Sequence, residues 1–176
     1  MKSVKFILII LLLVSNSLAS AKDSPRELLD SLPEEIGAFR ADEASSAYMN
    51  AYRKYRSKDI HINIELHEVA VALKDGCDSA ELQEIRQVHL NSAKDTTIKV
   101  GYDGEKELDL EGGKKIKLLF CRLLSSDYSK IVADLYLTGI KGYICKIWVT
   151  RFGLVVGQKE KKVDEALRVI FSELIE

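Results

Sequence analysis

Three apolar segments in the C-terminal half of the chain, joined by very short connections, constrain the fold more than any other feature. They occupy residues 115–124, 130–137 and 143–151, and the connections between them read SSDYS and GIKG. Parallel strands need a crossover of about a dozen residues or more, so connections this short join antiparallel neighbours. The sequence therefore predicts an antiparallel meander.

A segment with helical periodicity, EKKVDEALRVIFSELIE, follows the meander at residues 160–176. Its apolar residues recur three and four positions apart, which places them on one face of an α-helix. An amphipathic helix buries its apolar face, so we expect this helix to cover the sheet. The residues of that face are Val163, Ala166, Leu167, Ile170, Phe171 and Leu174.

Strict alternation occurs earlier, in DIHINIEL at residues 59–66, where apolar residues take every second position. Together with the preceding segment YMNAYRKYR, it predicts a β-hairpin that turns at Ser57-Lys58. Immediately after this strand, the apolar positions shift by one residue. A continuing strand then needs a β-bulge near His67-Glu68 to keep its apolar side chains on the same face.

Two further helices are predicted from their capping residues. In DSPRELLDSL, Ser24 is the N-cap, Pro25 is the first helical residue and Glu27 completes a capping box. In DGCDSAELQEIRQVHL, Asp78 or Ser79 caps a second helix. The apolar stripe expected on that helix consists of Leu82, Ile85 and Val88.

The rest of the chain is predicted from glycine and loop signals. Short strands are expected at residues 97–102 and 108–110, separated by a turn at Asp103-Gly104. The segment PEEIGAFRADEASS reads as irregular structure. Strands and helices that occupy separate blocks, joined by hairpin-length connections, are typical of an α+β domain. We therefore predict one α+β domain at residues 22–176, with an antiparallel sheet made of the hairpin and the meander and packed by helices.

The N-terminal 21 residues have the pattern of a secretory signal peptide. Lys2 and Lys5 precede an apolar run at residues 6–14, and Ala19-Ser20-Ala21 forms a small-residue cleavage site. The apolar run is shorter than the roughly 20 residues that span a bilayer, and no later segment is long and apolar enough. We expect cleavage near Ala21 and an exported protein, periplasmic or secreted, without a transmembrane segment.

The charge balance argues against a nucleic-acid partner. The 26 lysines and arginines include Lys2 and Lys5, so the chain after cleavage carries 24 of them against 27 acidic residues. Binding to phosphates requires a basic face that displaces counterions, and this composition offers no such excess.

A metal site is the first chemical hypothesis for the hairpin, because His61, Glu65 and His67 occupy alternate positions of one strand. A strand rises roughly 3.3 Å per residue, so His61 and His67 lie about 20 Å apart and cannot share an ion. Glu65 and His67 could do so, but the hairpin predicted above places only Asn50 and Tyr48 opposite them. We therefore expect no metal, with Glu65 and His67 as the candidates if one binds.

Three cysteines, Cys77, Cys121 and Cys145, leave at least one thiol unpaired within the chain. Cys121 and Cys145 belong to the first and third strands of the meander, about 9.5 Å apart at the usual strand spacing, whereas a disulfide needs Cα atoms within roughly 7 Å. Cys77 is thus the more plausible partner of Cys121 or Cys145, or of a cysteine in another molecule.

The residues around the hairpin and elsewhere do not form a known catalytic motif. GxSxG and a phosphate-binding glycine loop are missing, and HEVAV lacks the second histidine of a zinc protease. We therefore predict neither an enzyme nor a cofactor. An aromatic and basic cluster on the first hairpin strand has two interpretations, a contact surface or ordinary amphipathic strand packing. Its members are Tyr48, Tyr52, Arg53, Lys54, Tyr55 and Arg56.

The order of these segments resembles that of PsbP-like domains, which include the periplasmic DcrB-type proteins. The resemblance rests on SLPEEIGAFR leading into YRKYRSKDIHINIEL, then a helix, the meander KIVADLYLTGIKGYICKIWVTRF and a closing amphipathic helix, and it spans residues 32–175. It implies a non-enzymatic accessory or binding protein and assigns a function to no single residue.

The sequence thus predicts an exported, non-catalytic binding or accessory module of the cell envelope. The alternative is a carrier that holds a small apolar ligand between the sheet and the C-terminal helix. Leu167, Ile170 and Phe171 would line that pocket, so a filled core at these residues argues against the carrier.

Overall fold

The computed structural model describes residues 23–69, 73–94, 98–152 and 160–176, and the predicted signal peptide lies outside them. The strands in this part of the chain form one antiparallel sheet with the order β1-β2-β4-β5-β9-β8-β7-β6, and β3 pairs with β4. The strands are β1 (Glu35–Ile36), β2 (Phe39–Ala41), β3 (Ser45–Ala47), β4 (Asn50–Arg56), β5 (Ile60–Glu68), β6 (Lys99–Asp109), β7 (Lys115–Leu124), β8 (Ile131–Ile140) and β9 (Tyr143–Arg151). The helices are α2 (Pro25–Asp30), α3 (Ala80–Lys94), the 3-10 turn η1 (Glu111–Gly113) and α4 (Glu160–Ile175).

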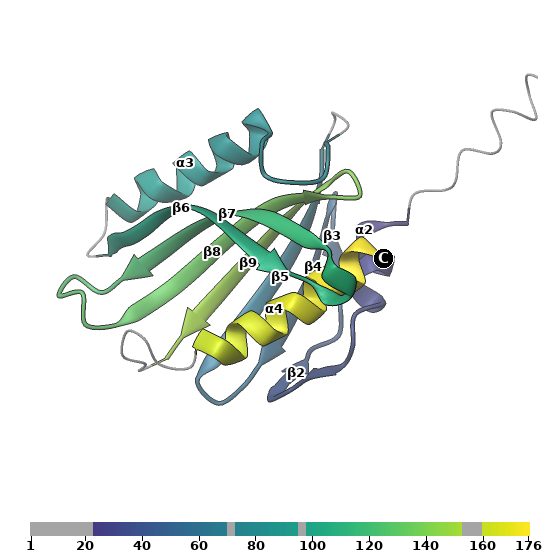
Figure 1. Cartoon of the computed structure of the whole chain (residues 1–176), viewed down its shortest axis with the longest axis horizontal. Helices are drawn as coiled ribbons and strands as arrows, with labels where there is room; N and C mark the ends of the chain where they lie inside the picture. Colours follow the sequence, from purple (N-terminus) through teal and green to yellow (C-terminus); the bar gives the residue numbers. More distant parts are fainter. Residues whose placement is uncertain (1–22, 70–72, 95–97, 153–159) are drawn as a thin grey trace, which may run out of the picture.

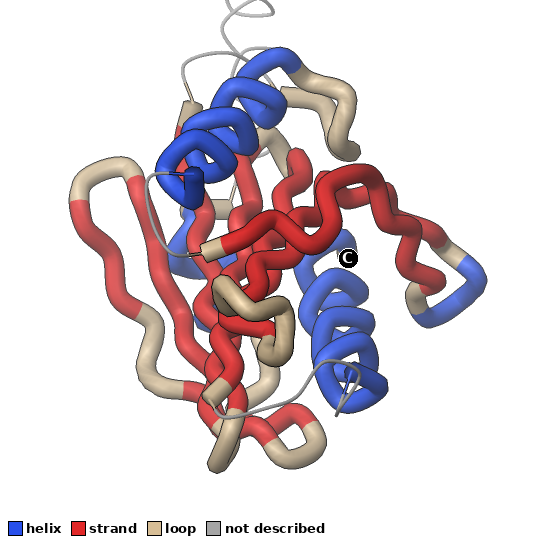
Figure 2. Tube along the Cα trace, turned by 90° about the vertical axis from the view of Figure 1, so that its left-hand side faces the viewer, coloured by secondary structure: helices blue, strands red, loops and turns tan. Residues whose placement is uncertain are grey.

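The sheet is covered on both faces, with α4 on one side and α3 on the other (Figures 1 and 2). The α4-side core combines α2 and α4 with the isoleucines of β5. The α3-side core is smaller and is built from Leu82 and Leu90 of α3 against leucines of β7 and β8. Strands make up most of the regular structure, so the α+β prediction is confirmed in its coarser form, an antiparallel sheet with helices that include a C-terminal one.

The meander is confirmed, because β7, β8 and β9 are consecutive antiparallel neighbours. The hairpin of β4 and β5 is also present and joins the meander through β5 and β9. That junction could not be read from local patterns, since β5 and β9 are far apart in the sequence.

The β-bulge predicted at His67-Glu68 is wrong. β5 pairs with β9 residue by residue from Ile60 to Glu68 without a register shift. Val69 then packs against the α3-side core, whereas the inward residues of β5 belong to the α4-side core. The shift in apolar phase therefore marks the point where the chain passes from one core to the other, which a single-core interpretation cannot accommodate.

The turn predicted at Asp103-Gly104 is also wrong, because β6 runs through it as one long strand. A Cβ atom at Gly104 would lie 2.8 Å from the hydroxyl oxygen of Tyr102, so this glycine lets the tyrosine pack over the strand. The irregularity in β6 lies instead between Val100 and Tyr102, where the register with β7 shifts.

The caps of the N-terminal helices follow the prediction. The Ser24 hydroxyl accepts the amide of Glu27 at 3.2 Å, and the Glu27 carboxylate accepts the amide of Ser24 at 2.7 Å. Ser79 caps α3 by accepting the amide of Leu82 at 3.2 Å. Val88, expected in the buried stripe of α3, is 57% exposed.

The segment expected to be irregular contains β1, β2 and the start of β3, which are too short to show alternation in the sequence. Among the described residues, no helix is long and apolar enough to cross a membrane.

Four ionic side chains attach the start of α4 to the sheet. Asp134 of β8 is fully buried and receives Nε of Arg122 at 2.9 Å and Nη2 of Arg151 at 2.7 Å. Arg122 also forms an ion pair with Glu160 in the first turn of α4. Buried charges are tolerated only when they are paired, so Asp134 supplies the counter-charge that allows Arg151 to be buried.

Candidate binding site on the polar face of β4 and β5

The hairpin register decides which polar side chains meet. Arg56 pairs with His61 across a four-residue connection that is closed by the amide of Ser57 donating to the carbonyl of Ile60 at 2.9 Å. The predicted turn was two residues tighter. Each side chain therefore keeps its predicted face but has a different partner, and Glu65 lies opposite Tyr52 rather than Asn50.

The aromatic and basic cluster of β4 divides between the two faces of the strand. The guanidinium of Arg53 is buried and donates to the carbonyl of Leu32 at 2.8 Å, just beyond α2. Tyr55 is also buried, whereas Tyr52 and Lys54 lie on the opposite, half-exposed face. Arg53 and Tyr55 therefore fit amphipathic strand packing, the second of the two interpretations, whereas Tyr52 and Lys54 remain accessible on the other face.

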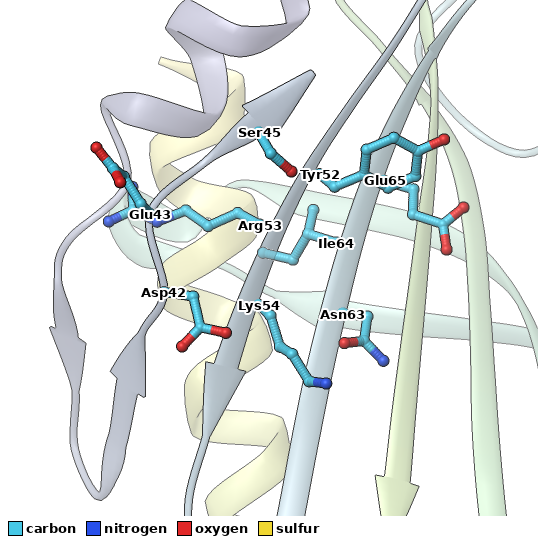
Figure 3. Close-up of a pocket in the computed structure, with 9 residues that line it drawn as sticks. All are labelled: Asp42, Glu43, Ser45, Tyr52, Arg53, Lys54, Asn63, Ile64 and Glu65. Carbon is cyan, nitrogen blue, oxygen red and sulfur yellow. The ribbon is translucent and has the colours of Figure 1, made fainter. Parts of the chain in front are cut away.

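A cavity of about 290 Å³ opens on the polar side of the hairpin. Along β4, one end pairs with β2 and the other end pairs with β3. Residues 42–44, which connect β2 to β3, lie beside the middle of β4, and the cavity is located there. Figure 3 shows the side chains of Tyr52, Lys54, Asn63 and Glu65 on these two strands and Arg53 pointing the other way. The lining residues, which we call the hairpin pocket, are Asp42, Glu43, Ser45, Tyr52, Arg53, Lys54, Asn63, Ile64 and Glu65.

Glu65 links the hairpin pocket to a charged cluster that it forms with His67 of β5 and Lys146 of β9. Its carboxylate accepts Nζ of Lys146, which lies directly opposite on β9, at 2.6 Å, and it contacts Nε2 of His67 at 3.1 Å. Burial alone would raise the pKa of Glu65. The hydrogen bonds from His67 and Lys146 lower it by more than burial raises it, so the pKa lies below its ordinary value. The carboxylate is therefore ionised at neutral pH and already holds a cation.

The structure thus brings the two metal candidates, Glu65 and His67, together and adds an ammonium group to them. A metal ion needs several ligands around one point, and Lys146 takes the position beside Glu65 with a positive charge. His61 is separated from this cluster, with its ring 4.8 Å from that of Phe152.

Two aromatic residues that sequence reasoning did not single out complete the site. The ring of His89 on α3 lies 5.2 Å from that of Trp148, edge to face, and Trp148 pairs with Asn63 across β5 and β9. Burial, followed by the charge of Lys146, lowers the pKa of His89. The outward positions of Lys146 and Trp148 can be read from the alternation of YICKIWVTR, but their neighbours depend on the strand order.

A second group of potential ligands lies on the α3 side of β6. The sulfur of Cys77 and carboxylate oxygens of Asp78 and Glu105 lie within 4.8 Å of one another. Burial, with the charges of Glu105 and Asp78, raises the pKa of the Cys77 thiol. Because the thiolate is the form that binds metals, this environment opposes coordination by Cys77.

The three cysteines are free and buried. Cys77 and Cys121 belong to the α3-side core, and Cys145 belongs to the α4-side core, so a disulfide to Cys145 would have to cross the sheet. Burial raises the pKa of Cys121 to about 11 and that of Cys145 even further above its ordinary value. Of the pairings predicted for Cys77, only the one with Cys121 lies on a single face of the sheet.

No protein-family model matches the chain, and no curated protein matches its sequence.

Proposed function

We propose that the protein is an exported, non-catalytic binding or accessory module of the cell envelope, which holds a protein partner on the polar face of β4, β5 and β9. The observation that carries this proposal is the hairpin pocket beside the Glu65–Lys146 ion pair. α3 lies along β6, β7 and β8, so this part of the sheet keeps half-exposed polar and aromatic side chains in a fixed arrangement. The resemblance to PsbP-like domains points in the same direction.

The chemistry of the site supports binding rather than catalysis. Glu65 is engaged by Lys146 and His67, so its carboxylate is stabilised in the ionised form and is a poor general base. The raised pKa values keep the buried thiols protonated at neutral pH, and a protonated thiol is a weak nucleophile.

The packing of α4 weighs against the carrier alternative. Leu167, Ile170 and Phe171 are buried in the α4-side core together with the inward residues of β5. Among the described residues, side chains that already fill the space around these three positions leave no room for an apolar ligand.

Site-specific photo-crosslinking in intact cells tests the proposal. A crosslinking amino acid at Asn63 lies in the hairpin pocket, and one at Arg168 lies on the exposed side of α4 as the control. We expect one discrete protein adduct from position 63, a much weaker one when Lys54→Glu is added, and none from position 168. Equal adducts at both positions, or none at position 63, would contradict the proposed surface.

Export is tested separately by the mass of the protein recovered from the envelope or the medium. We expect a chain that begins at Lys22. A cytoplasmic chain that retains residues 1–21 would contradict export. The crosslinking experiment would still test the binding surface, because it does not depend on cleavage.

A further inference from the structure

The sheet ends at β6, on the opposite side of its strand order from the hairpin pocket. Among the described residues, β6 pairs with β7 alone, so the outer edge of an 11-residue strand carries unpaired backbone groups. Figure 2 shows β6 crossing the front of the view between α3 and α4, with no other described segment in front of it. A long free edge is a template on which another strand can add.

The side chains of β6 divide by alternation. Lys106 forms an ion pair with Asp164 of α4 at 2.7 Å, and Leu108 belongs to the α4-side core, so the even-numbered residues face α4. The odd-numbered residues face the α3 side, where Asp103 meets Arg86 of α3 at 2.6 Å. These odd-numbered residues form what we call the acidic row: Asp103, Glu105, Glu107 and Asp109.

Neighbouring cations neutralise the acidic row only in part. Arg86 pairs with Asp103, and Lys115 serves both Glu107 and Asp109 at 2.6 and 3.4 Å. Lys117 of β7 lies opposite Glu107 on the same face, so three cations stand against the four carboxylates of the row. Among the described residues, no lysine or arginine forms an ion pair with Glu105, whose carboxylate lies near that of Asp78. The row therefore carries excess negative charge along an exposed strand.

The acidic row discriminates between two possible occupants of the edge. When two copies of β6 pair antiparallel, their acidic rows lie on the same face and place like charges side by side, which is destabilising. A strand with lysine or arginine at every second position places opposite charges there instead. The same carboxylates thus disfavour self-association and favour a basic partner.

We propose that the β6 edge binds an extended, basic protein segment by strand addition, with alternate lysine or arginine side chains facing the acidic row. The regular part of β6, residues 102–109, has a length of about 27 Å and offers room for a segment of about eight residues. The hydroxyl of Tyr102 donates to the carbonyl of Glu105 at 3.2 Å. In the proposed complex, a backbone amide of the added strand replaces this hydroxyl as the donor. This site is remote from the hairpin pocket, so the proposal does not depend on the function proposed above.

Fluorescence anisotropy with synthetic peptides tests the edge. The probe is a labelled peptide of about eight residues that alternates lysine with valine or threonine, and its matched control carries glutamate in place of each lysine. Two further peptides carry equal numbers of backbone N-methyl groups, one on the amides of odd-numbered residues and one on those of even-numbered residues. In strand addition only one of these two sets faces β6.

We expect saturable binding of the lysine peptide, weakened by added salt, and no binding of the glutamate peptide. One N-methylated peptide should bind like the parent and the other should not bind. Equal binding of both N-methylated peptides would show a purely electrostatic contact and overturn strand addition. Failure of the lysine peptide to bind would also overturn the proposal.

Variants of the protein locate the contact. Glu105→Lys replaces an attraction with a repulsion at an exposed position and should weaken peptide binding about fivefold. Glu165→Lys makes the same change on the exposed side of α4 and should leave the affinity unaltered. Equal weakening by both variants would overturn the assignment to β6.

Sedimentation tests whether a second copy of the chain occupies the edge instead. Concentration-dependent dimerisation of the wild type, strengthened or abolished by Glu105→Lys, would assign the edge to that second copy and overturn the proposal.

Discussion

At the residue scale, the central finding is that a candidate metal ligand is already paired with a cation. Glu65 and His67 have the residue types and the proximity for metal binding, and their closeness was predictable because they are two residues apart on one strand. Lys146 was not predictable as their neighbour, since it lies on β9 and meets Glu65 only through the β5–β9 pairing. The sequence thus predicts pairs along a strand, whereas pairs across distant strands depend on the assembled sheet.

Zinc titration by calorimetry tests this interpretation. We expect the wild-type protein and His67→Ala to give the same heats without stoichiometric binding, because the ammonium of Lys146 occupies the position of a cation beside Glu65. A stoichiometric binding isotherm that disappears in His67→Ala would contradict this expectation and restore the metal hypothesis.

The pKa values of two histidines depend on two different lysines. Burial and then Lys146 lower the pKa of His89, and burial and then Lys54 lower that of His61. We expect Lys146→Met to raise the pKa of His89 without moving that of His61, and Lys54→Met to do the reverse. Proton NMR titration of the imidazole resonances measures both shifts. If either variant moved both histidines equally, the local arrangement described for the two lysines would be wrong.

The sign of the associated stability effect follows from the lowered pKa values. The unfolded chain binds a proton at His61 and His89 more readily than the folded protein does, and it does so as the pH falls below the ordinary imidazole pKa of about 6.5. The free energy of unfolding therefore decreases as the pH falls below that value. The urea midpoint of the wild type, measured across this range, checks the direction.

At the element scale, local periodicity predicts an element well when one face of it is buried along its whole length. β7, β9 and α4 were predicted within a residue or so because alternation or helical spacing runs through each of them. β6 was divided in two because Gly104 was interpreted as a turn residue, although it accommodates Tyr102. The meaning of a glycine depends on what packs against it, and the sequence does not contain that information in a local form.

The attachment of α4 to the sheet through Asp134 gives a prediction at the same scale. Asp134→Asn leaves Arg151 without a buried counter-charge, and we expect it to lower the free energy of unfolding by about 3–5 kcal/mol. Asp30→Asn removes an exposed ion pair with Arg26 and should cost less than about 1 kcal/mol. Urea denaturation of both variants measures the difference, and equal effects would contradict a structural role of the buried pair.

At the scale of the whole molecule, the presence of two cores explains why the β-bulge predicted at His67-Glu68 is wrong. A sheet with one buried face requires a bulge where the apolar positions shift, whereas a sheet covered on both faces lets Val69 join the α3-side core directly. The same division places Cys145 and Cys121 on opposite faces, a stronger obstacle to a disulfide than strand separation alone. The sequence predicted the α4-side core because a long amphipathic helix marks it, and it predicted α3 but not that this helix covers a second core.

The α4-side core also provides the sharpest test between a binding module and an apolar-ligand carrier. Phe171 is 1% exposed and packs between α4 and the sheet, so Phe171→Ala should lower the free energy of unfolding by about 3–5 kcal/mol and leave a cavity. We expect the wild type to show no saturable binding of a fluorescent fatty acid, and the variant to bind a small aromatic molecule such as benzene, because an engineered apolar cavity accepts such a guest. A wild-type protein that binds the fatty acid stoichiometrically, with affinity reduced in Phe171→Ala, would instead establish a ligand space between the sheet and α4. The packing of Leu167, Ile170 and Phe171 predicts the first outcome, since a carrier must keep empty the volume that these side chains fill.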